Sequence, residues 1–258
     1  MLLTMDVGNT QTVIGVFEGE ELKGHWRFAT QADRSTDEYR IYLRAILGLE
    51  GFSREQLTGA AIASVVPGAT QALRGIASEI ASGPTVVVEA GIKTGVPILI
   101  DNPREVGADR VMNSVAALHK YGAPVIVVDF GTSTNFDVVD AEGSYIGGAI
   151  APGAEVSHDA LIGRAAALRR VELVPPRSVI GKGTVEAIQS GLVFGHAGMV
   201  DGIIDRLREE IGPDTTVIAT GGLAPTIVPH CRTVERVDEF LTLDGLRMVF
   251  HLNAEEEN

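Results

Sequence analysis

Near the start of the chain stands the stretch Asp6-Val7-Gly8-Asn9-Thr10-Gln11-Thr12. The apolar run 2–5 leads into it and the apolar run 13–17 leads away from it. This pattern predicts a β-hairpin whose turn exposes one carboxylate, backbone N–H groups and hydroxyls. Glycine lets a ligand approach the backbone, amides and hydroxyls donate hydrogen bonds, and a carboxylate holds a cation. Such a turn suits a phosphate group together with Mg²⁺.

A single Asp-x-Gly turn between strands is more often a plain hairpin, but here the pattern recurs. The apolar run 125–128 leads to Asp129-Phe130-Gly131-Thr132-Ser133-Thr134-Asn135, and a further apolar run follows. Asp6 and Asp129 lie 129 − 6 = 123 positions apart, close to half of the 258 residues. A repeat of this size predicts two similar domains, each of which presents a hairpin turn to a shared cleft. We place the boundary at the turn 121–124, which gives domains of residues 1–120 and 121–258.

Composition narrows the class of protein. Apolar residues make up 45% of the chain and aromatic residues only 5%, with 30 glycines, which fits an α/β protein with many tight junctions. The net charge of −13 argues against a nucleic-acid partner or an anionic membrane surface. The one cysteine, Cys231, permits neither an intrachain disulfide nor a cysteine-based zinc site, and the six histidines show no paired metal spacing. We expect a cytoplasmic protein, because neither a signal peptide nor a membrane-spanning run is evident.

The first half alternates between strands and helices, as doubly wound folds do. Ser35 and Glu38 form a capping-box pattern ahead of a helix with apolar residues at 39, 43, 46 and 47. The apolar run 60–66 reads as a central strand, and a loop is expected at 92–102.

Asp109 and Arg110 fall in the first turns of the next predicted helix, off its apolar stripe of Val111, Val115 and Leu118. They have two interpretations. In one, Asp109 merely suits the positive end of the helix dipole and Arg110 is solvated. In the other, Asp109 accepts a substrate proton and Arg110 fixes an anionic group.

In the second half, helices are predicted at 155–169 and 185–211. Gly181-Lys182-Gly183-Thr184 precedes the longer one but is no Walker loop, because Pro176 stands at the position of the first glycine. Thr184 is instead expected as a helix N-cap. Glycines at 191, 195, 198 and 202 predict a flat stripe for close helix packing, and Gly221-Gly222 follows a strand predicted at 216–219. A strand at 233–237 and a helix at 243–252 complete the pattern.

The sequence resembles the acetate and sugar kinase/Hsp70/actin superfamily and, more narrowly, the type III pantothenate kinase family. The resemblance covers essentially the whole chain, and it rests on motifs in matching order and spacing: Asp6-Val7-Gly8-Asn9-Thr10, Ser64-Val65-Val66-Pro67, Asn102-Pro103, Gly107-Ala108-Asp109-Arg110, Asp129-Phe130-Gly131-Thr132, Gly147-Gly148, Pro152-Gly153 and Gly181-Lys182-Gly183-Thr184. It implies two ribonuclease-H-like domains, a duplicated β-β-β-α-β-α-β-α arrangement with a cleft between them.

The family phosphorylates pantothenate to 4′-phosphopantothenate with ATP, the first step toward coenzyme A, and the resemblance implies the same reaction here. It assigns Asp109 as the general base, Asp129 as the ligand of K⁺ or NH₄⁺, and Asp6 as the ligand of Mg²⁺. The implied ATP-binding residues are Asp6, Val7, Gly8, Asn9, Thr10, Gln11, Thr12, Val13 and Thr132. The implied pantothenate-binding residues are Gly107, Ala108, Asp109, Arg110 and Thr184. Thr184 is expected at the interface of a homodimer, since the family forms homodimers.

The sequence departs from the family pattern at two places. The second loop usually reads Gly-Thr-Ala-Thr-Thr, whereas this chain has Gly131-Thr132-Ser133-Thr134-Asn135. The replacements keep small polar side chains, so the phosphate assignment stands. Many members carry Tyr where this chain has Ile100, so the pantothenate contact there becomes apolar and substrate affinity is in question.

Two rival functions remain open from the sequence. One is another kinase of the superfamily, acting on acetate, a sugar or an amino sugar, which would need a different acceptor motif at 107–110. The other is a nucleotide-dependent regulatory protein without catalysis. The presence of Asp6, Asp109 and Asp129 together weighs against it, because a protein that only binds a nucleotide needs no general base.

Overall fold

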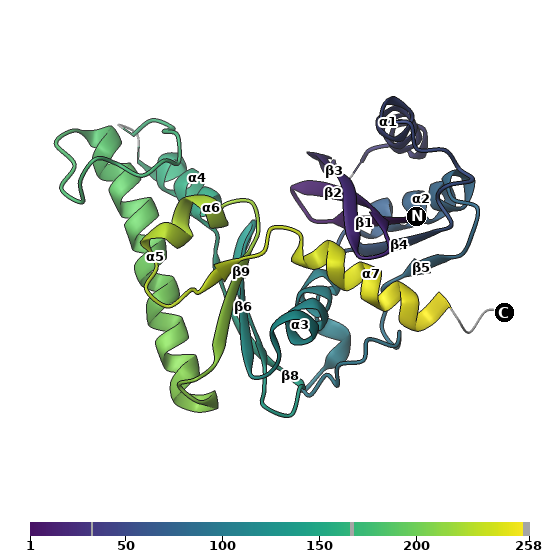
Figure 1. Ribbon diagram of the computed structural model, residues 1–258. Helices are drawn as coiled ribbons and strands as arrows, with labels where there is room; N and C mark the ends of the chain where they lie inside the picture. The colour runs from purple at the N-terminus through teal and green to yellow at the C-terminus, as the bar shows by residue number, and fades with distance from the viewer. Residues whose placement is uncertain (32, 166–167, 255–258) are drawn as a thin grey trace. The chain divides into compact units, whose positions relative to one another are not determined.

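The computed structural model describes residues 1–31, 33–165 and 168–254 and divides into two compact units. Unit 1 comprises residues 1–116 together with the C-terminal helix α7, and unit 2 comprises residues 117–240. Each unit contains a five-stranded mixed sheet with helices packed against it (Figure 1).

Unit 1 is built on the sheet β3-β2-β1-β4-β5. Its elements are β1 (Leu2–Val7), β2 (Gln11–Glu18), β3 (Glu21–Ala29), α1 (Thr36–Leu49), β4 (Gly59–Ser64), α2 (Pro67–Ile80), β5 (Thr85–Val87), the 3₁₀ turn η1 (Pro103–Glu105), α3 (Ala108–Tyr121), whose last residues belong to unit 2, and α7 (Leu241–Ala254). The predicted capping box is confirmed, because Ser35 Oγ accepts from Glu38 N at 3.3 Å and Glu38 Oε2 accepts from Ser35 N at 2.8 Å.

Unit 2 is built on the sheet β10-β9-β6-β7-β8. Its elements are β6 (Val125–Phe130), β7 (Ser133–Val139), β8 (Tyr145–Pro152), α4 (Ala154–Arg164), α5 (Thr184–Ile211), β9 (Thr216–Thr220), α6 (Ala224–Ile227), the 3₁₀ turn η2 (Val228–His230) and β10 (Arg236–Val237). Its core joins apolar residues of β6, β7 and β9 to Ala197, Val200 and Ile204 of α5.

The two sheets have the same topology, which confirms the predicted duplication and the ribonuclease-H-like class. In each, the first three strands form an antiparallel meander, and the fourth strand then pairs in parallel with the first and with the fifth. The correspondence extends to local detail. A register irregularity interrupts the pairing of the second and third strands at Val16/Phe17 in unit 1 and at Val138/Val139 in unit 2.

The C-terminal helix differs from the predicted division, which placed all of 121–258 in one domain. α7 lies against the sheet of unit 1 because two glycines leave room for its side chains. A Cβ at Gly59 would come within 2.3 Å of Phe250, and one at Gly15 within 2.9 Å of Leu243. Thr242 Oγ1 also donates to Asn113 Oδ1 at 2.7 Å, which ties the start of α7 to α3.

Three local predictions need correction or limits. α4 ends at Arg164 rather than at 169, and residues 166–167 of the predicted helix lie outside the described residues. Thr184 is the first residue of α5, and Gly183 occupies the N-cap position. The glycine stripe of α5 is not packed within this chain, because a Cβ at Gly191, Gly195 or Gly198 would have no atom of another described segment within 4 Å.

In the ranges described, no helix is long and apolar enough to cross a membrane.

Candidate active site

The first hairpin turn leaves the carboxyl end of β1 as predicted. Val7 pairs with Thr12, so four residues, 8–11, form the turn, and Gly8 N donates to Gln11 O at 3.0 Å. Asp6 is half-buried in the last part of the strand, whereas the side chains at 9, 10 and 11 are exposed. The turn therefore presents small polar groups to solvent beside one partly desolvated carboxylate.

The base of this turn is held by two threonines, one of which was assigned to ATP binding. Thr12 is fully buried, and its Oγ1 lies 2.8 Å from Oγ1 of Thr30. Thr30 N in turn donates to Thr10 O at 2.9 Å. The Thr12 hydroxyl thus anchors the turn to the end of β3, and Val13 behind it is half-buried. No sequence motif pointed to Thr30, because it follows the strand as an ordinary polar residue.

Asp109 lies at the same edge of the sheet as Asp6. β4 pairs in parallel with β1, and Val65, directly after β4, donates from its N to Val7 O at 3.0 Å. A Cβ at Gly107 would come within 2.4 Å of Asp109 Oδ1 and 3.6 Å of Val65 Cγ1. Glycine at 107 therefore lets the Asp109 carboxylate fold back beside the end of β4, next to the strand that carries Asp6.

Two opposing effects act on the ionisation of Asp109. Burial raises the pKa of the Asp109 carboxyl above its usual value, and the hydrogen bond from Arg110 N to Oδ1 at 2.9 Å opposes that rise. The side chain is nevertheless only partly covered, so a substrate can reach it. A carboxylate with a raised pKa, held at the first turn of a helix, has the properties of a general base. Arg110, the next residue of α3, is also half-buried.

The second hairpin turn repeats the first with one residue fewer. Phe130 pairs with Thr134, so three residues, 131–133, form the turn, and Gly131 N donates to Ser133 O at 3.0 Å. Asp129 is half-buried at the strand end, as Asp6 is, and Thr132 is exposed. Leu223 N donates to Phe130 O at 3.3 Å, in the same way that Val65 N donates to Val7 O.

Two glycines enclose this second turn. Gly221 has a φ of +93°, and a Cβ there would come within 2.5 Å of Asp129 Oδ1 and 2.7 Å of the Phe130 backbone. A Cβ at Gly153 would come within 2.5 Å of the carbonyl oxygens of Gly131 and Thr132. The sequence indicated that these glycine loops admit a close approach, and the structure identifies the second turn as what approaches them.

The donor set fits ions that keep part of their hydration. Among the described residues, no group of three or more His, Cys, Asp or Glu is positioned to hold a metal. A divalent ion at Asp6 would therefore depend on water and nucleotide phosphates for its other ligands, as Mg²⁺ commonly does. At Asp129 Oδ1, Gly221 approaches so closely that a Cβ would come within 2.5 Å.

The remaining assigned residue, Thr184, belongs to unit 2. It begins α5, which has 28 residues and is therefore about 42 Å long, and its side chain is exposed. Gly181 packs against the first turn of α5, since a Cβ there would come within 2.4 Å of Ala187 N. Ile100 is half-buried in the segment before η1.

Comparison with known proteins identifies the family. The family model described as type III pantothenate kinase matches residues 2–206. The type III pantothenate kinase of Frankia alni is 54% identical over 254 residues, which cover 98% of this chain and 100% of that protein. The corresponding protein of Acidothermus cellulolyticus is 52% identical over 257 residues, covering 99% and 100% of the two chains.

Solved structures of lower identity share the fold. The activator of 2-hydroxyisocaproyl-CoA dehydratase from Clostridium difficile, with bound ADPNP, matches with a TM-score of 0.55 at 12% identity, over 99% of this chain and 96% of that one. The ROK hexokinase of Thermus thermophilus matches with a TM-score of 0.52 at 13% identity, over 99% of both chains. Since the family model and the curated relatives span most or all of the chain, this protein belongs to the type III pantothenate kinase family.

Proposed function

We propose that this chain, which as a type III pantothenate kinase phosphorylates pantothenate with ATP in coenzyme A biosynthesis, uses Asp109 as its general base. The observation that carries the proposal is the position of Asp109 beside the end of β4, next to the strand that ends in Asp6. A base must lie within reach of the hydroxyl whose proton it takes, and the phosphates must lie close by.

Phosphoryl transfer depends mainly on positioning and on neutralising charge. The first turn would offer the phosphates the backbone N–H groups of residues 9 and 10 and exposed hydroxyl and amide side chains, while the N–H of Gly8 closes the turn onto Gln11 O. Asp6 would hold Mg²⁺ against the phosphates. Asp109 would take the proton of the pantothenate hydroxyl as it attacks the γ-phosphate in line. Arg110 would bind the pantothenate carboxylate by a charge-assisted hydrogen bond.

The second turn is proposed to bind the other side of the nucleotide. Thr132 would donate to a phosphate oxygen, and Asp129 would hold K⁺ or NH₄⁺. Support comes from the close approach of Gly221 to Asp129 Oδ1 and from the topology that the two turns share. Under this proposal each turn contributes contacts to the ATP phosphates.

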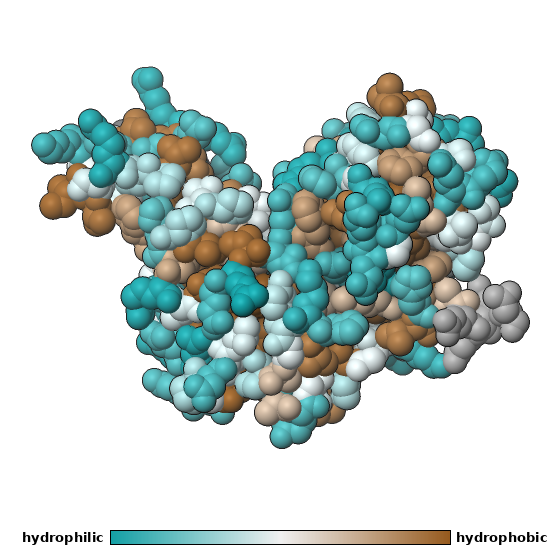
Figure 2. Space-filling model, in the orientation of Figure 1, coloured by the Kyte–Doolittle hydropathy of each residue, from teal (hydrophilic) through white to brown (hydrophobic). Residues whose placement is uncertain are grey.

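A homodimer is proposed through the region around the start of α5. Val179, Ile180 and Val185 are 66%, 81% and 54% exposed, which is unusual for three large apolar residues close together. Figure 2 shows hydrophobic side chains gathered over α4 and the start of α5, at the upper left of the view. The unpacked glycines of α5 would let a second copy approach closely. Thr184 would then reach pantothenate across the dimer interface.

An ADP-release assay with a panel of acceptors tests the substrate. Pantothenate should support ADP release in the presence of Mg²⁺ and K⁺, whereas acetate, glucose and N-acetylmannosamine should not. Turnover with one of those acceptors but not with pantothenate would contradict the assignment. For the dimer, sedimentation should give twice the chain mass, and Ile180→Lys should give the monomer.

A further inference from the structure

Unit 1 contains a cavity of about 300 Å³ that lies away from the candidate active site. It is formed by the end of α1, the segment 52–57 and the end of α2. Thr58, which follows that segment, donates from its N to Met1 O at 2.8 Å, so the cavity adjoins the amino-terminal end of the sheet. Asp6 lies at the opposite end of β1, five residues or about 16 Å further along the strand.

The floor of the cavity is formed by apolar residues that are packed into the core of unit 1. Leu47, Leu57 and Ile80 are only 3%, 1% and 7% exposed and belong to the core of unit 1. Phe52 forms one wall, and the ring of Trp26 fixes it edge to face at a centroid distance of 5.9 Å. The floor and this wall are thus present before any ligand arrives, as in most small-molecule sites.

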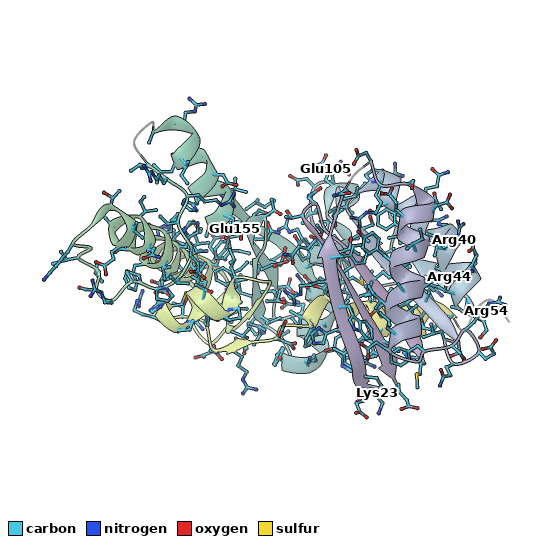
Figure 3. All side chains as sticks on the ribbon, turned by 90° about the horizontal axis from the view of Figure 1, so that it is seen from above. Lys23, Arg40, Arg44, Arg54, Glu105 and Glu155 are labelled. Carbon is cyan, nitrogen blue, oxygen red and sulfur yellow. The ribbon has the colours of Figure 1, made fainter. Side chains whose placement is uncertain are left out.

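The rim carries positive charge in a protein whose net charge is −13. Arg44 and Arg54 both line the cavity, and Glu79 is the only carboxylate among its described lining residues. Arg40 already binds both oxygens of Glu79, at 2.9 and 3.0 Å, and this pair of bonds lowers the pKa of the Glu79 carboxyl. Arg44 approaches Glu79 only to 3.6 Å. Figure 3 shows Arg40, Arg44 and Arg54 along one side of unit 1.

The two rim arginines have donors available for a ligand. A guanidinium carries five N–H donors, and Arg54 uses its Nε toward Ala81 O at 3.4 Å. Arg44 is 60% exposed in its side chain. A cavity lined by two arginines and by apolar core residues is complementary to an anionic head group on an apolar body.

We propose that this cavity binds a small amphipathic anion, with its carboxylate or phosphate at Arg44 and Arg54 and its apolar part on Leu47, Leu57 and Ile80. The site is separate from the site of phosphoryl transfer and does not depend on the proposed reaction. It takes a ligand whose head group is negatively charged and rejects one whose head group is positively charged.

Gly48 gives a sharp test because it lines the cavity from an exposed helical position. A Cβ at Gly48 would meet no atom within 4 Å, so a larger side chain there enters open space and should not strain the fold. Gly75 is a matched control, since it is also exposed, lies within α2 and has no atom within 4 Å of its Cβ position, but it does not line the cavity.

Calorimetric titration with octanoate, octanol and octylammonium would measure the binding. We expect wild type to bind octanoate at least roughly tenfold more tightly than octanol, because a hydrogen bond to a charged group adds that much affinity. Octylammonium should bind more weakly than octanol. Gly48→Leu should weaken octanoate binding by roughly tenfold or more, while Gly75→Leu binds as wild type does. Arg44→Gln with Arg54→Gln should remove the preference for octanoate over octanol.

Three results would overturn the inference: no binding of octanoate to the wild type, unchanged binding in Gly48→Leu, or equal affinity for octanoate and octylammonium. Thermal melts of each variant identify any that fail to fold. If the double variant fails to fold, Arg44→Gln alone, at an exposed position, should reduce the preference for octanoate over octanol.

Discussion

The two hairpin turns stand on the same strand framework but are built differently. The first has four residues, and the hydroxyl contact between Thr12 and Thr30 holds its base to the end of β3. Its exposed side chains face solvent. The second has three residues and is enclosed by Gly153 and Gly221. Only the first lies at a sheet edge that also carries Asp109. The duplicated fold therefore places both acids at equivalent strand ends, and the loops around them give the two acids different surroundings.

The largest expected effect concerns Asp109, the proposed general base, which lies at the same edge of the unit 1 sheet as the first turn. Asp109→Asn should lower kcat by about 10²–10⁴-fold, the usual contribution of a general base, with the fold intact. An ADP-release assay with pantothenate measures it. Asp37→Asn is a matched control, since Asp37 is also the second residue of a 14-residue helix, and it should retain full turnover. Wild-type turnover in Asp109→Asn would remove the base assignment.

The two strand-end acids should respond to different ions. Asp6→Asn should raise the MgCl₂ concentration needed for half-maximal activity by at least roughly 10–100-fold, which is typical of disturbed metal sites. The variant should keep the preference for K⁺ over Na⁺. Asp129→Asn should lose that preference. Titrations of MgCl₂ in KCl and in NaCl separate the two effects. If both variants lose the same ion dependence, or if wild type is fully active in Na⁺ alone, the division of roles between the turns is wrong.

The glycines should also distinguish the turns. Gly221→Ala forces a Cβ against Asp129 and the Phe130 backbone at a positive φ, which should cost about 1–3 kcal/mol of unfolding free energy. Gly8→Ala is the control, because its Cβ would meet only Gln11 O, at 3.2 Å, and should cost less. Chemical denaturation of both variants gives the comparison. Equal stability of the two would mean that the second turn is not enclosed as described.

The anchor of the first turn should have a smaller effect. Thr12→Val removes a buried hydroxyl that lies 2.8 Å from Thr30 Oγ1, which should cost about 1 kcal/mol of unfolding free energy. The Michaelis constant for ATP should rise as the turn loosens, with kcat less affected. Thr30→Val should reproduce both effects, since it breaks the same pair, and an unchanged Michaelis constant in both variants would separate the turn from ATP binding.

The smallest expected effect is a change of stability with pH. Because the pKa of Asp109 is raised in the folded protein, the folded state holds its proton to higher pH than the unfolded state does. The contribution of Asp109 to stability is therefore favourable at low pH and is lost as the pH rises through the raised pKa. Asp109→Asn should melt at the same or a higher temperature than wild type at neutral pH, and a lower melting temperature at neutral pH but not at acid pH would contradict this sign.

Much of the framework could be predicted from the sequence because its signals are local and repeated. The apolar strands, both Asp-x-Gly turns and the capping box at Ser35 are all read from short windows, and the structure confirms them. The placement of α7 could not be read in this way, because it depends on Gly59 and Gly15 meeting Phe250 and Leu243 far along the chain.

The candidate site residues could be predicted in part, again because their sequence signals are short and local. The internal repeat pointed to the residues at both turns, and the family resemblance pointed to 107–110. The structure places Asp6 and Asp109 at one edge of unit 1. No sequence motif indicated that Thr12 is buried against Thr30, since a threonine in a turn looks alike whether it faces a ligand or the core. Thr184 was expected as an N-cap, but the extended backbone of Gly183 fills that position.

The most direct test is a crystal structure of the protein with a non-hydrolysable ATP analogue, Mg²⁺ and pantothenate. We predict that residues of both turns contact the triphosphate, with Asp6 at the Mg²⁺ ion and the pantothenate hydroxyl within hydrogen-bond distance of Asp109. A nucleotide bound by only one turn, or a pantothenate hydroxyl out of reach of Asp109, would contradict the account.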